Sequence, residues 1–153
     1  IHFTIDNDGT IFQYLDMNHV AYHCGKHNPT TVGVEISNAF YPKYNSWYQR
    51  HGFGKREMVK NATVHGREIK PFTDFYPAQV GALKALMKAC HKALNIPLEC
   101  PLDDNGETSY TVDNNAVKNR FKGFISHYHV SKGKMDCANL DLKALLEEIK
   151  DEE

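Results

Sequence analysis

The sequence predicts one α/β domain, with a central mixed β-sheet and helices packed against it. Three observations lead to this prediction. Apolar and polar residues alternate on both sides of an Asp-Gly pair near the start of the chain, a β-branched run follows, and a later stretch repeats its apolar residues at helical spacing. Hydrophobic residues make up 41% of the 153 residues, which is enough for one core of ordinary size, so we expect residues 1–153 to form a single domain.

The first elements are predicted as a β-hairpin and a third strand. Residues His2–Asp6 alternate, and residues Thr10–Tyr14 alternate again. The pair Asp8-Gly9 between them supplies the positive φ angles that a tight hairpin turn requires. The run VGVEIS, Val32–Ser37, is typical of a buried strand and carries one charge, Glu35.

The rest of the chain predicts an irregular excursion, two helices and one more strand. Residues 38–73 are aromatic and follow no clear period, which indicates a long surface loop. Apolar residues recur at helical spacing over Pro77–Leu94, with proline at the favoured first position. Residues Phe121–Val130 are typical of a strand that runs into a loop, and the tail from Asn139 or Leu140 predicts a closing helix.

The charge and hydropathy of the chain give no indication of nucleic acid or of a membrane. The 18 Lys and Arg residues nearly balance the 19 Asp and Glu residues, so no overall field attracts a polyanion. There is no apolar run of about 18 residues and no charged start with an apolar centre, so we expect no membrane insertion. Four cysteines lie far apart without CxxC pairs and leave the compartment open. We therefore expect local recognition by a monomer.

One cluster has the residue types of a metal site. The segment HYHVSKGKMDC runs from His127 to Cys137 and combines imidazole, ammonium, carboxylate and thiol. Neutral imidazole and carboxylate oxygen both bind zinc at about 2.0–2.2 Å. Asp136 follows His127 by nine residues, which is long enough for a loop to bring both to one ion. The alternative is a solvated turn in which Lys132, Lys134 and Asp136 face water, and spacing alone does not separate the two.

Three further features each have two interpretations. Glu35 in an apolar strand is costly unless it is paired or hydrogen-bonded, so it is either a general base with a pKa raised by burial or a strand-end residue paired with a lysine. His23, before Gly25, lies either at the polar tip of a shaped loop or in an ordinary core or surface position. The aromatic residues Phe40–Phe53 either line a groove for sugar rings or anchor their own loop.

Five blocks of the chain, in this order, resemble the zinc-dependent N-acetylmuramoyl-L-alanine amidases. These include phage endolysins, bacterial cell-wall and recycling amidases, and the related peptidoglycan recognition proteins. The resemblance runs from His2 to about Leu142, and residues 38–73 match least. The blocks are HFTIDNDGTIFQYLD, AYHCG, NPTTVGVEISN, FYPAQVGALKAL and SHYHVSKGKMD.

The resemblance implies a peptidoglycan amidase with zinc as its cofactor. In that family zinc is held by two histidines and a third ligand that is Asp or Cys, and water attacks the lactyl–L-alanine amide. A carboxylate base takes the proton from the water in some members, and a lysine or similar residue stabilises the oxyanion. The implied site residues are the metal ligands His127 and Asp136, the catalytic residues Glu35 and Lys134, and the substrate-binding residues His23 and Asn28.

The chain departs from the family pattern at the metal site. The family's first zinc histidine lies on a strand upstream of the block that begins at His2, and no residue here matches it. Either a natural strand before Ile1 supplies that ligand, or this chain binds the metal weakly or by another route, with His2 only as a fallback. Cys137 and Ala138 replace the Pro-Gly that commonly follows the aspartate, so either Cys137 or Asp136 could bind the metal.

The leading hypothesis is hydrolysis of the amide between N-acetylmuramic acid and L-alanine in peptidoglycan or a muropeptide. Such an enzyme acts on the cell wall, so we expect it to be secreted, periplasmic or released by a phage. The alternative is a non-catalytic peptidoglycan-binding receptor module of the same fold. The residues implied for catalysis favour the enzyme, whereas the missing first ligand favours the receptor.

Overall fold

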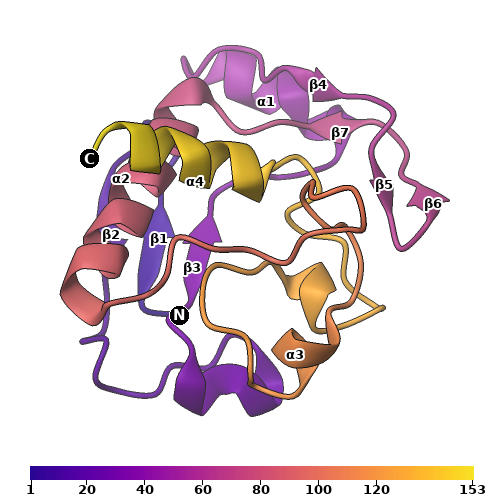
Figure 1. The fold of residues 1–153 in the computed structure, drawn as a ribbon. Coiled ribbons are helices and arrows are strands. Elements are labelled where there is room, and N and C mark those ends of the chain that lie inside the picture. The colour runs from indigo at the N-terminus through magenta and orange to yellow at the C-terminus, as the bar shows by residue number, and fades with distance from the viewer. The chain divides into compact units, whose positions relative to one another are not determined.

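The computed structural model describes residues 1–153 and contains short strands and helices (Figure 1). The chain divides into two compact units. Unit 1 comprises Ile1–Lys60 and Pro71–Leu83, and unit 2 comprises Asn61–Lys70 and Lys84–Glu153. The predicted α/β class is confirmed, although the sheets are small. The single-domain organisation stays a prediction.

Unit 1 contains the predicted mixed sheet. Strands β1 (Phe3–Ile5), β2 (Ile11–Gln13) and β3 (Val34–Ile36) lie in the order β2-β1-β3. Strand β1 pairs antiparallel with β2 and parallel with β3, so two segments about 30 residues apart lie side by side (Figure 1). Strand β3 is shorter than the predicted run Val32–Ser37 because only its central three residues form the ladder.

The hairpin prediction is confirmed, but the turn differs from the expected two-residue type. The Asp6 N–H donates to the Thr10 carbonyl at 2.8 Å, which leaves a three-residue loop between them. Gly9 has a φ of 86°. The Asp8 carboxylate accepts from the Thr10 N–H at 2.9 Å and closes the loop. This matches a hairpin loop in which a left-handed residue follows a type I turn.

The three-stranded sheet has one face that is buried at β1 and one open face. Phe3 and Ile5 are 6% and 0% exposed, whereas Phe12 and Glu35 are exposed. Thr4 pairs with Phe12 on one side and with Glu35 on the other, so these three side chains share the open face. The prediction of a buried third strand is therefore wrong for Glu35, because its neighbours on β3 face inward while it faces solvent.

Helix α2 spans Pro77–Leu94, as the sequence predicts. Its first part belongs to unit 1, where Gln79 is fully buried and its Nε2 donates to the Ser37 carbonyl just beyond β3 at 2.8 Å. Its remainder belongs to unit 2. Asn95 follows the helix with a φ of 54°, a left-handed conformation that commonly ends helices. The buried apolar residues of the helix are Leu83, Leu86, Met87 and Cys90.

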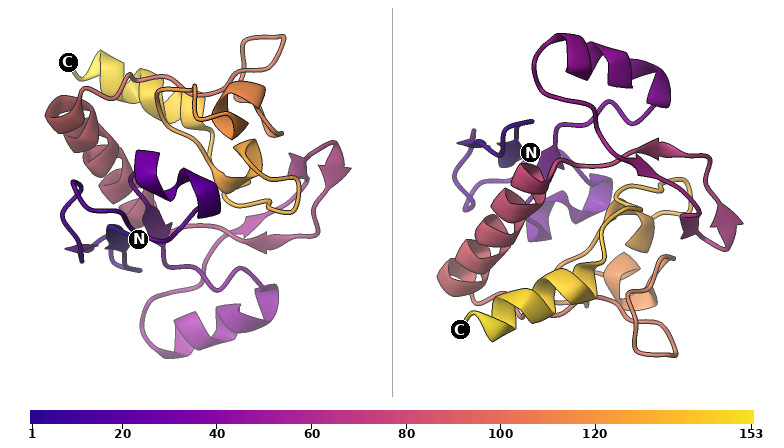
Figure 2. Two further views of the ribbon diagram at one scale, coloured as in Figure 1. Left: turned by 90° about the horizontal axis from the view of Figure 1, so that it is seen from below. Right: turned by 90° about the horizontal axis from the view of Figure 1, so that it is seen from above.

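The excursion 38–73 is more ordered than the sequence predicts. Phe40 stacks on Phe72 with ring centroids 4.7 Å apart, so apolar packing rather than local propensity orders it. In both views of Figure 2 the part that carries α1 loops away from the three-stranded sheet of unit 1. Its elements are η2 (Pro42–Tyr44), α1 (Asn45–Arg50), β4 (Met58–Val59), β5 (Thr63–Val64), β6 (Arg67–Glu68) and β7 (Phe72–Thr73). Strand β4 pairs with β7 in unit 1, and β5 pairs with β6 in unit 2.

A buried arginine connects this excursion to the sheet of unit 1. Arg56 is 1% exposed, and its guanidinium carbon lies 4.3 and 4.0 Å from the ring centroids of Tyr48 and Tyr76. Such a sandwich is a favourable cation–π arrangement when water is excluded. The guanidinium donates to Asn7 Oδ1, the carbonyls of Ser37 and Asp74, and Gln79 Oε1.

Unit 2 contains the end of α2 and two further helices. Helix α3 (Asn114–Val117) is short, and helix α4 (Leu142–Asp151) is the predicted closing helix. Helix α4 begins two or three residues later than expected because Asp141 caps it by accepting from the Ala144 N–H at 3.1 Å. None of the helices has the length and apolar character needed to span a membrane.

The predicted strand over Phe121–Val130 is wrong. Within it Gly123 has a φ of 146°, and a Cβ there would lie 2.3 Å from the Glu99 carbonyl oxygen. The Phe124 N–H donates to the same carbonyl at 2.8 Å, but no strand pairs with the segment. The segment ends in the 3₁₀ helix η3 (His127–His129). Its apolar and aromatic residues therefore pack without forming the hydrogen-bond ladder of a β-strand.

Candidate functional site

The structure brings His127 and Asp136 together in unit 2. His127 begins η3, and the chain then turns, with the Lys134 N–H donating to the Ser131 carbonyl at 3.2 Å. The Gly133 N–H donates to the Ser131 hydroxyl at 3.2 Å and tightens the same turn. As a result Asp136 Oδ2 lies 2.5 Å from His127 Nδ1. The predicted return of the carboxylate to the histidine is therefore observed.

The pair has the chemistry of two zinc ligands. Burial acts to raise the pKa of Asp136, but the hydrogen bond and charge of His127 outweigh it and lower the pKa below its usual range. The carboxylate is thus ionised at neutral pH. Two ligands on a tetrahedral ion at 2.0–2.2 Å lie roughly 3.4 Å apart, so this pair would separate by roughly 1 Å to hold one zinc.

The donor set in the structure is smaller than a complete catalytic zinc site. Such a site takes three protein ligands. No group of three or more His, Cys, Asp or Glu side chains lies where it could hold a metal ion together. His127 and Asp136 therefore fit two of the ligand positions.

Cys137 is a poorer candidate than Asp136. It is only partly exposed, and burial, followed by the negative charge of Asp136, raises the pKa of the Cys137 thiol to about 12. The thiolate is the form that binds metals, whereas this environment favours the protonated thiol. Of the two residues that the sequence left open, Asp136 is the one whose carboxylate oxygen lies against His127 Nδ1.

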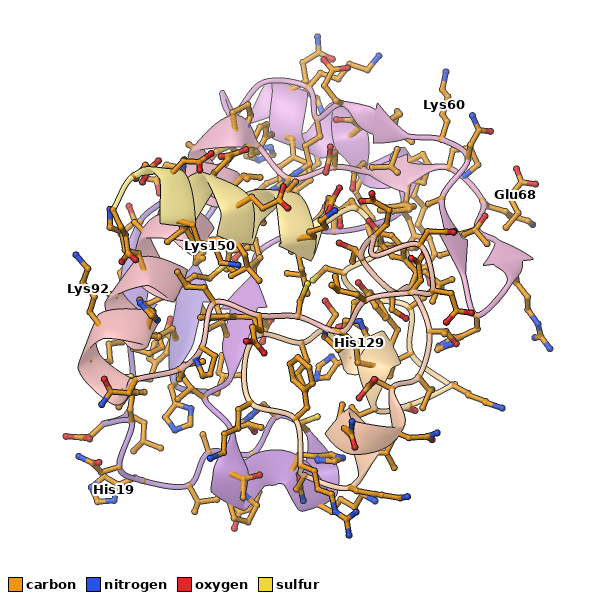
Figure 3. All side chains as sticks on the ribbon, in the orientation of Figure 1. His19, Lys60, Glu68, Lys92, His129 and Lys150 are labelled. Carbon is orange, nitrogen blue, oxygen red and sulfur yellow. The ribbon has the colours of Figure 1, made fainter.

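The two histidines of η3 have different environments. His129 is 0% exposed and lies among the loops of unit 2 (Figure 3). Its Nδ1 accepts from the Ser126 N–H at 2.9 Å, and its Nε2 donates to the Ser109 carbonyl at 2.7 Å. Burial lowers the pKa of His129, which favours the neutral ring that these bonds require. His129 therefore anchors η3, and His127 carries the candidate chemistry.

Glu35 lies in unit 1 on the open face of the three-stranded sheet. Phe12 and Tyr14 stack on this face with centroids 6.5 Å apart, and the Tyr14 hydroxyl lies 2.9 Å from Thr4 Oγ1. Glu35 is exposed, so its expected burial is wrong, and it takes part in none of the ion pairs, so the expected lysine partner is wrong as well. An exposed carboxylate is accessible to a substrate. Its role as a base stays a prediction.

His23 and Asn28 shape one loop of unit 1. Asn28 is 9% exposed, and its Oδ1 accepts from the N–H groups of His23 and Cys24 at 3.0 and 2.7 Å. The His23 ring packs on Gly33, where a Cβ would lie 2.3 Å from its Cγ, and its Nε2 lies 2.7 Å from the Thr31 hydroxyl. Asn28 thus has a task in building the loop. Contact of either residue with substrate stays a prediction.

His2 is not available as a fallback ligand. It is 1% exposed, and both ring nitrogens are engaged with the backbone. Its Nε2 donates to the His19 carbonyl at 2.8 Å, and its Nδ1 accepts from the Gly33 N–H at 3.0 Å. The expectation that His2 could replace the missing ligand is therefore wrong, because binding a metal would break one of these buried hydrogen bonds.

Comparison with protein families shows which family the chain belongs to. The model of the N-acetylmuramoyl-L-alanine amidase family matches residues 1–137, which include β1–β3, α2 and the loop from His127 to Asp136. The chain belongs to this family. Membership indicates a hydrolase of the amidase type that acts on peptidoglycan, and it confirms the resemblance read from the sequence. No curated protein and no solved structure is significantly similar to this amidase.

The sequence did not single out one residue that contacts the loop of the amidase. His65 Nε2 lies 2.9 Å from the Lys134 carbonyl oxygen, and both residues belong to unit 2. Lys134 itself is exposed. The available signal was the pair His65-Gly66 between two short alternating segments, which is a turn pattern, but the surrounding region follows no clear period.

Proposed function

We propose that this amidase hydrolyses the amide bond between N-acetylmuramic acid and L-alanine, and that it depends on zinc. The approach of His127 Nδ1 to Asp136 Oδ2 at 2.5 Å carries the proposal. An imidazole and an ionised carboxylate that face each other at the surface form a donor set suited to zinc. In a chain of the amidase family, the simplest purpose of this pair is to hold the metal.

His127 and Asp136 would hold the zinc, and Asp136 rather than Cys137 would supply the anionic ligand. When bound, zinc polarises the scissile carbonyl and makes a coordinated water more acidic. The two side chains are 35% and 53% exposed, so an ion can reach them from solvent.

Two residues of the chain have proposed roles in the chemical step. Glu35 would take the proton from the attacking water and pass it to the amine of the leaving L-alanine, a task that needs an accessible carboxylate. The Lys134 ammonium would stabilise the negative charge that develops on the carbonyl oxygen. His23 and Asn28 would form part of the surface that receives the substrate. In the structure both residues make hydrogen bonds within their own loop.

The proposed substrate is peptidoglycan or a muropeptide released from it. The protein would act as a monomer on the cell wall, as a bacteriolytic enzyme of the endolysin kind or as a bacterial wall amidase. Neither nucleic acid nor a membrane takes part in this proposal, since the net charge is −1.

Metal content tests the cofactor. Elemental analysis of the purified protein should find one zinc per chain, and Asp136→Ala should lose it. Asp104→Ala is the matched control, because Asp104 is an exposed loop carboxylate outside the site. A protein that holds no zinc, releases no product and still binds cell-wall sacculi would overturn the enzyme and leave a receptor.

Replacement of Glu35 tests the base. Glu35→Gln should lower turnover of a muropeptide by a factor on the order of a hundred or more, because loss of a general base typically costs that much. Zinc content should stay at the parent level. Glu147→Gln, on the exposed side of α4, is the control and should be neutral. If Glu35→Gln digests muropeptides at the parent rate, Glu35 is not the base.

A further inference from the structure

His65 connects two segments of unit 2 that are far apart in the sequence. It lies between β5 and β6, and its Nε2 is 2.9 Å from the Lys134 carbonyl oxygen. Its Nδ1 is 3.1 Å from Thr111 Oγ1, and its backbone N–H donates to the Tyr110 carbonyl at 2.9 Å. The ring therefore bridges the segment of Tyr110 and Thr111 to the loop that carries Lys134 and Asp136.

The partners determine which nitrogen of the neutral ring carries the hydrogen. A carbonyl oxygen only accepts, so Nε2 of His65 must donate to Lys134. Nδ1 then accepts from the Thr111 hydroxyl, which can act as a donor. Both ring nitrogens are thus used in one orientation of the ring, and the orientation is defined by residues from two different segments.

The backbone of His65 has a left-handed conformation. His65 and Gly66 have φ angles of 54° and 71°, so the turn between β5 and β6 has both central residues in the left-handed region. Asn and Gly are the most common first residues of such a turn, and His is also enriched among the residues other than Gly that adopt this left-handed conformation. The ring contacts with Thr111 and Lys134 are interactions that Gly at this position would lack.

The same segment also holds the other end of the loop. The Ser109 carbonyl accepts from His129 Nε2 at 2.7 Å, and the Asp113 N–H donates to the His129 carbonyl at 2.9 Å. His129 is two residues from His127. Residues 109–113 therefore fix the His127 end through His129 and fix the Asp136 end through the Thr111–His65 bridge.

We propose that His65 is a positioning residue of the amidase. It holds the Lys134 backbone so that Asp136 stays opposite His127 and the Lys134 ammonium keeps its direction. The His65 ring hydrogen-bonds to Thr111 and to the main chain of Lys134 rather than to either candidate ligand, so it would act through the main chain of Lys134. The inference rests on the proposed function of the His127–Asp136 loop.

His65→Asn separates this role from the role of the turn. Asn favours the left-handed turn, so the hairpin should form as well as before, but its side chain is too short to reach Lys134. We expect the melting temperature of the metal-free protein to be unchanged or higher. Zinc affinity, measured by competition with a chromophoric chelator, should fall about tenfold, the lower end of the range for residues that orient metal ligands. On a muropeptide, kcat should fall and KM should stay the same.

Two further variants define the result. Thr111→Val removes the donor that orients the His65 ring, so it should lower zinc affinity in the same direction by a smaller factor. His19→Asn replaces an exposed histidine of unit 1, whose side chain points into solvent (Figure 3), and should change neither quantity. Zinc affinity and kcat of His65→Asn within twofold of the parent would overturn the inference. A loss that accompanies a lower melting temperature would overturn it too, because it would reflect unfolding.

A metal-free measurement distinguishes failure of this inference from failure of the proposed function. If the parent binds no zinc and cleaves no muropeptide, the proposed function fails. The backbone order parameters of residues 134–136 from ¹⁵N relaxation still report on positioning. They should fall in His65→Asn relative to the parent and to His19→Asn. Unchanged order parameters would overturn the positioning role whether or not the protein is a zinc enzyme.

Discussion

Replacement of Arg56 by methionine should destabilise unit 1 strongly. The methionine keeps an unbranched apolar side chain between the rings of Tyr48 and Tyr76 but removes every donor of the guanidinium. The Ser37 carbonyl would keep a partner, because Gln79 Nε2 also donates to it at 2.8 Å. The Asp74 carbonyl and Asn7 Oδ1 would each lose the arginine donor.

The size of the effect follows from these losses. A buried acceptor that loses its donor costs about 1–3 kcal/mol, and a desolvated cation–π contact contributes up to about 2 kcal/mol. Since methionine recovers part of the ring packing, we expect Arg56→Met to lower the free energy of unfolding by about 3–5 kcal/mol. At a urea m-value of about 2 kcal/mol/M the midpoint would move down by roughly 2 M.

Urea unfolding followed by tryptophan fluorescence measures this shift, since Trp47 lies in the excursion that Arg56 anchors. Arg56→Lys should recover little, because a single ammonium cannot donate in four directions or stack as a planar group. Arg50→Met, an exposed arginine in the same unit, should change stability by no more than about 0.5 kcal/mol. If Arg56→Met and Arg50→Met unfold at the same urea concentration, the guanidinium does not hold unit 1 together.

Two other changes test close packing and burial. Gly33→Ala should lower the free energy of unfolding by about 1–3 kcal/mol, because the new Cβ would lie 2.3 Å from the His23 ring. Chemical denaturation measures this loss, and an unchanged free energy of unfolding would contradict the close packing. Burial, followed by the charge of Asp141, raises the pKa of the Cys100 thiol to about 11 from its usual 9.0. A raised pKa leaves less thiolate, so at pH 8 iodoacetamide should modify Cys100 at least about 100-fold more slowly in the folded protein than in urea, and equal rates would refute the assignment.

The parts of the fold that the sequence predicts well depend on local signals. Helix α2 has apolar residues at helical spacing, Pro77 at its first position and Asn95 after its last, and its bounds match. The hairpin β1–β2 is likewise encoded by alternation around Gly9. Both are elements in which neighbours within a few residues determine the conformation.

The predictions that failed depend on what lies beside a segment. Residues Phe121–Val130 have a strand-like composition, but no strand pairs with them. Glu35 was expected to be buried because its neighbours are β-branched, yet a three-stranded sheet leaves one of its faces open. The excursion 38–73 is ordered by the hydrogen bonds of Arg56 and by the contact of Phe40 with Phe72. Neither interaction can be predicted from the periodicity of the sequence.

The histidines show most clearly what spacing can and cannot tell about a site. His127 and Asp136 could be paired from the sequence because Asp136 follows His127 by nine residues, which is far enough for the chain to turn back. His2 and His129 are no less prominent in the sequence, yet each is buried and has both ring nitrogens hydrogen-bonded to the backbone. Either histidine would have to lose one of these hydrogen bonds to bind a metal.

A ligand histidine must instead direct a ring nitrogen toward an acidic side chain or an ion, and this property depends on side-chain packing. The same reasoning identifies His65, whose contact with Lys134 joins positions 69 residues apart. That contact reaches the main chain of the loop rather than a ligand. Replacement of His65 should therefore alter how accurately the candidate ligands are positioned, while the ligands themselves stay the same. A variant that changes zinc affinity without changing zinc stoichiometry would have the signature expected of such a residue.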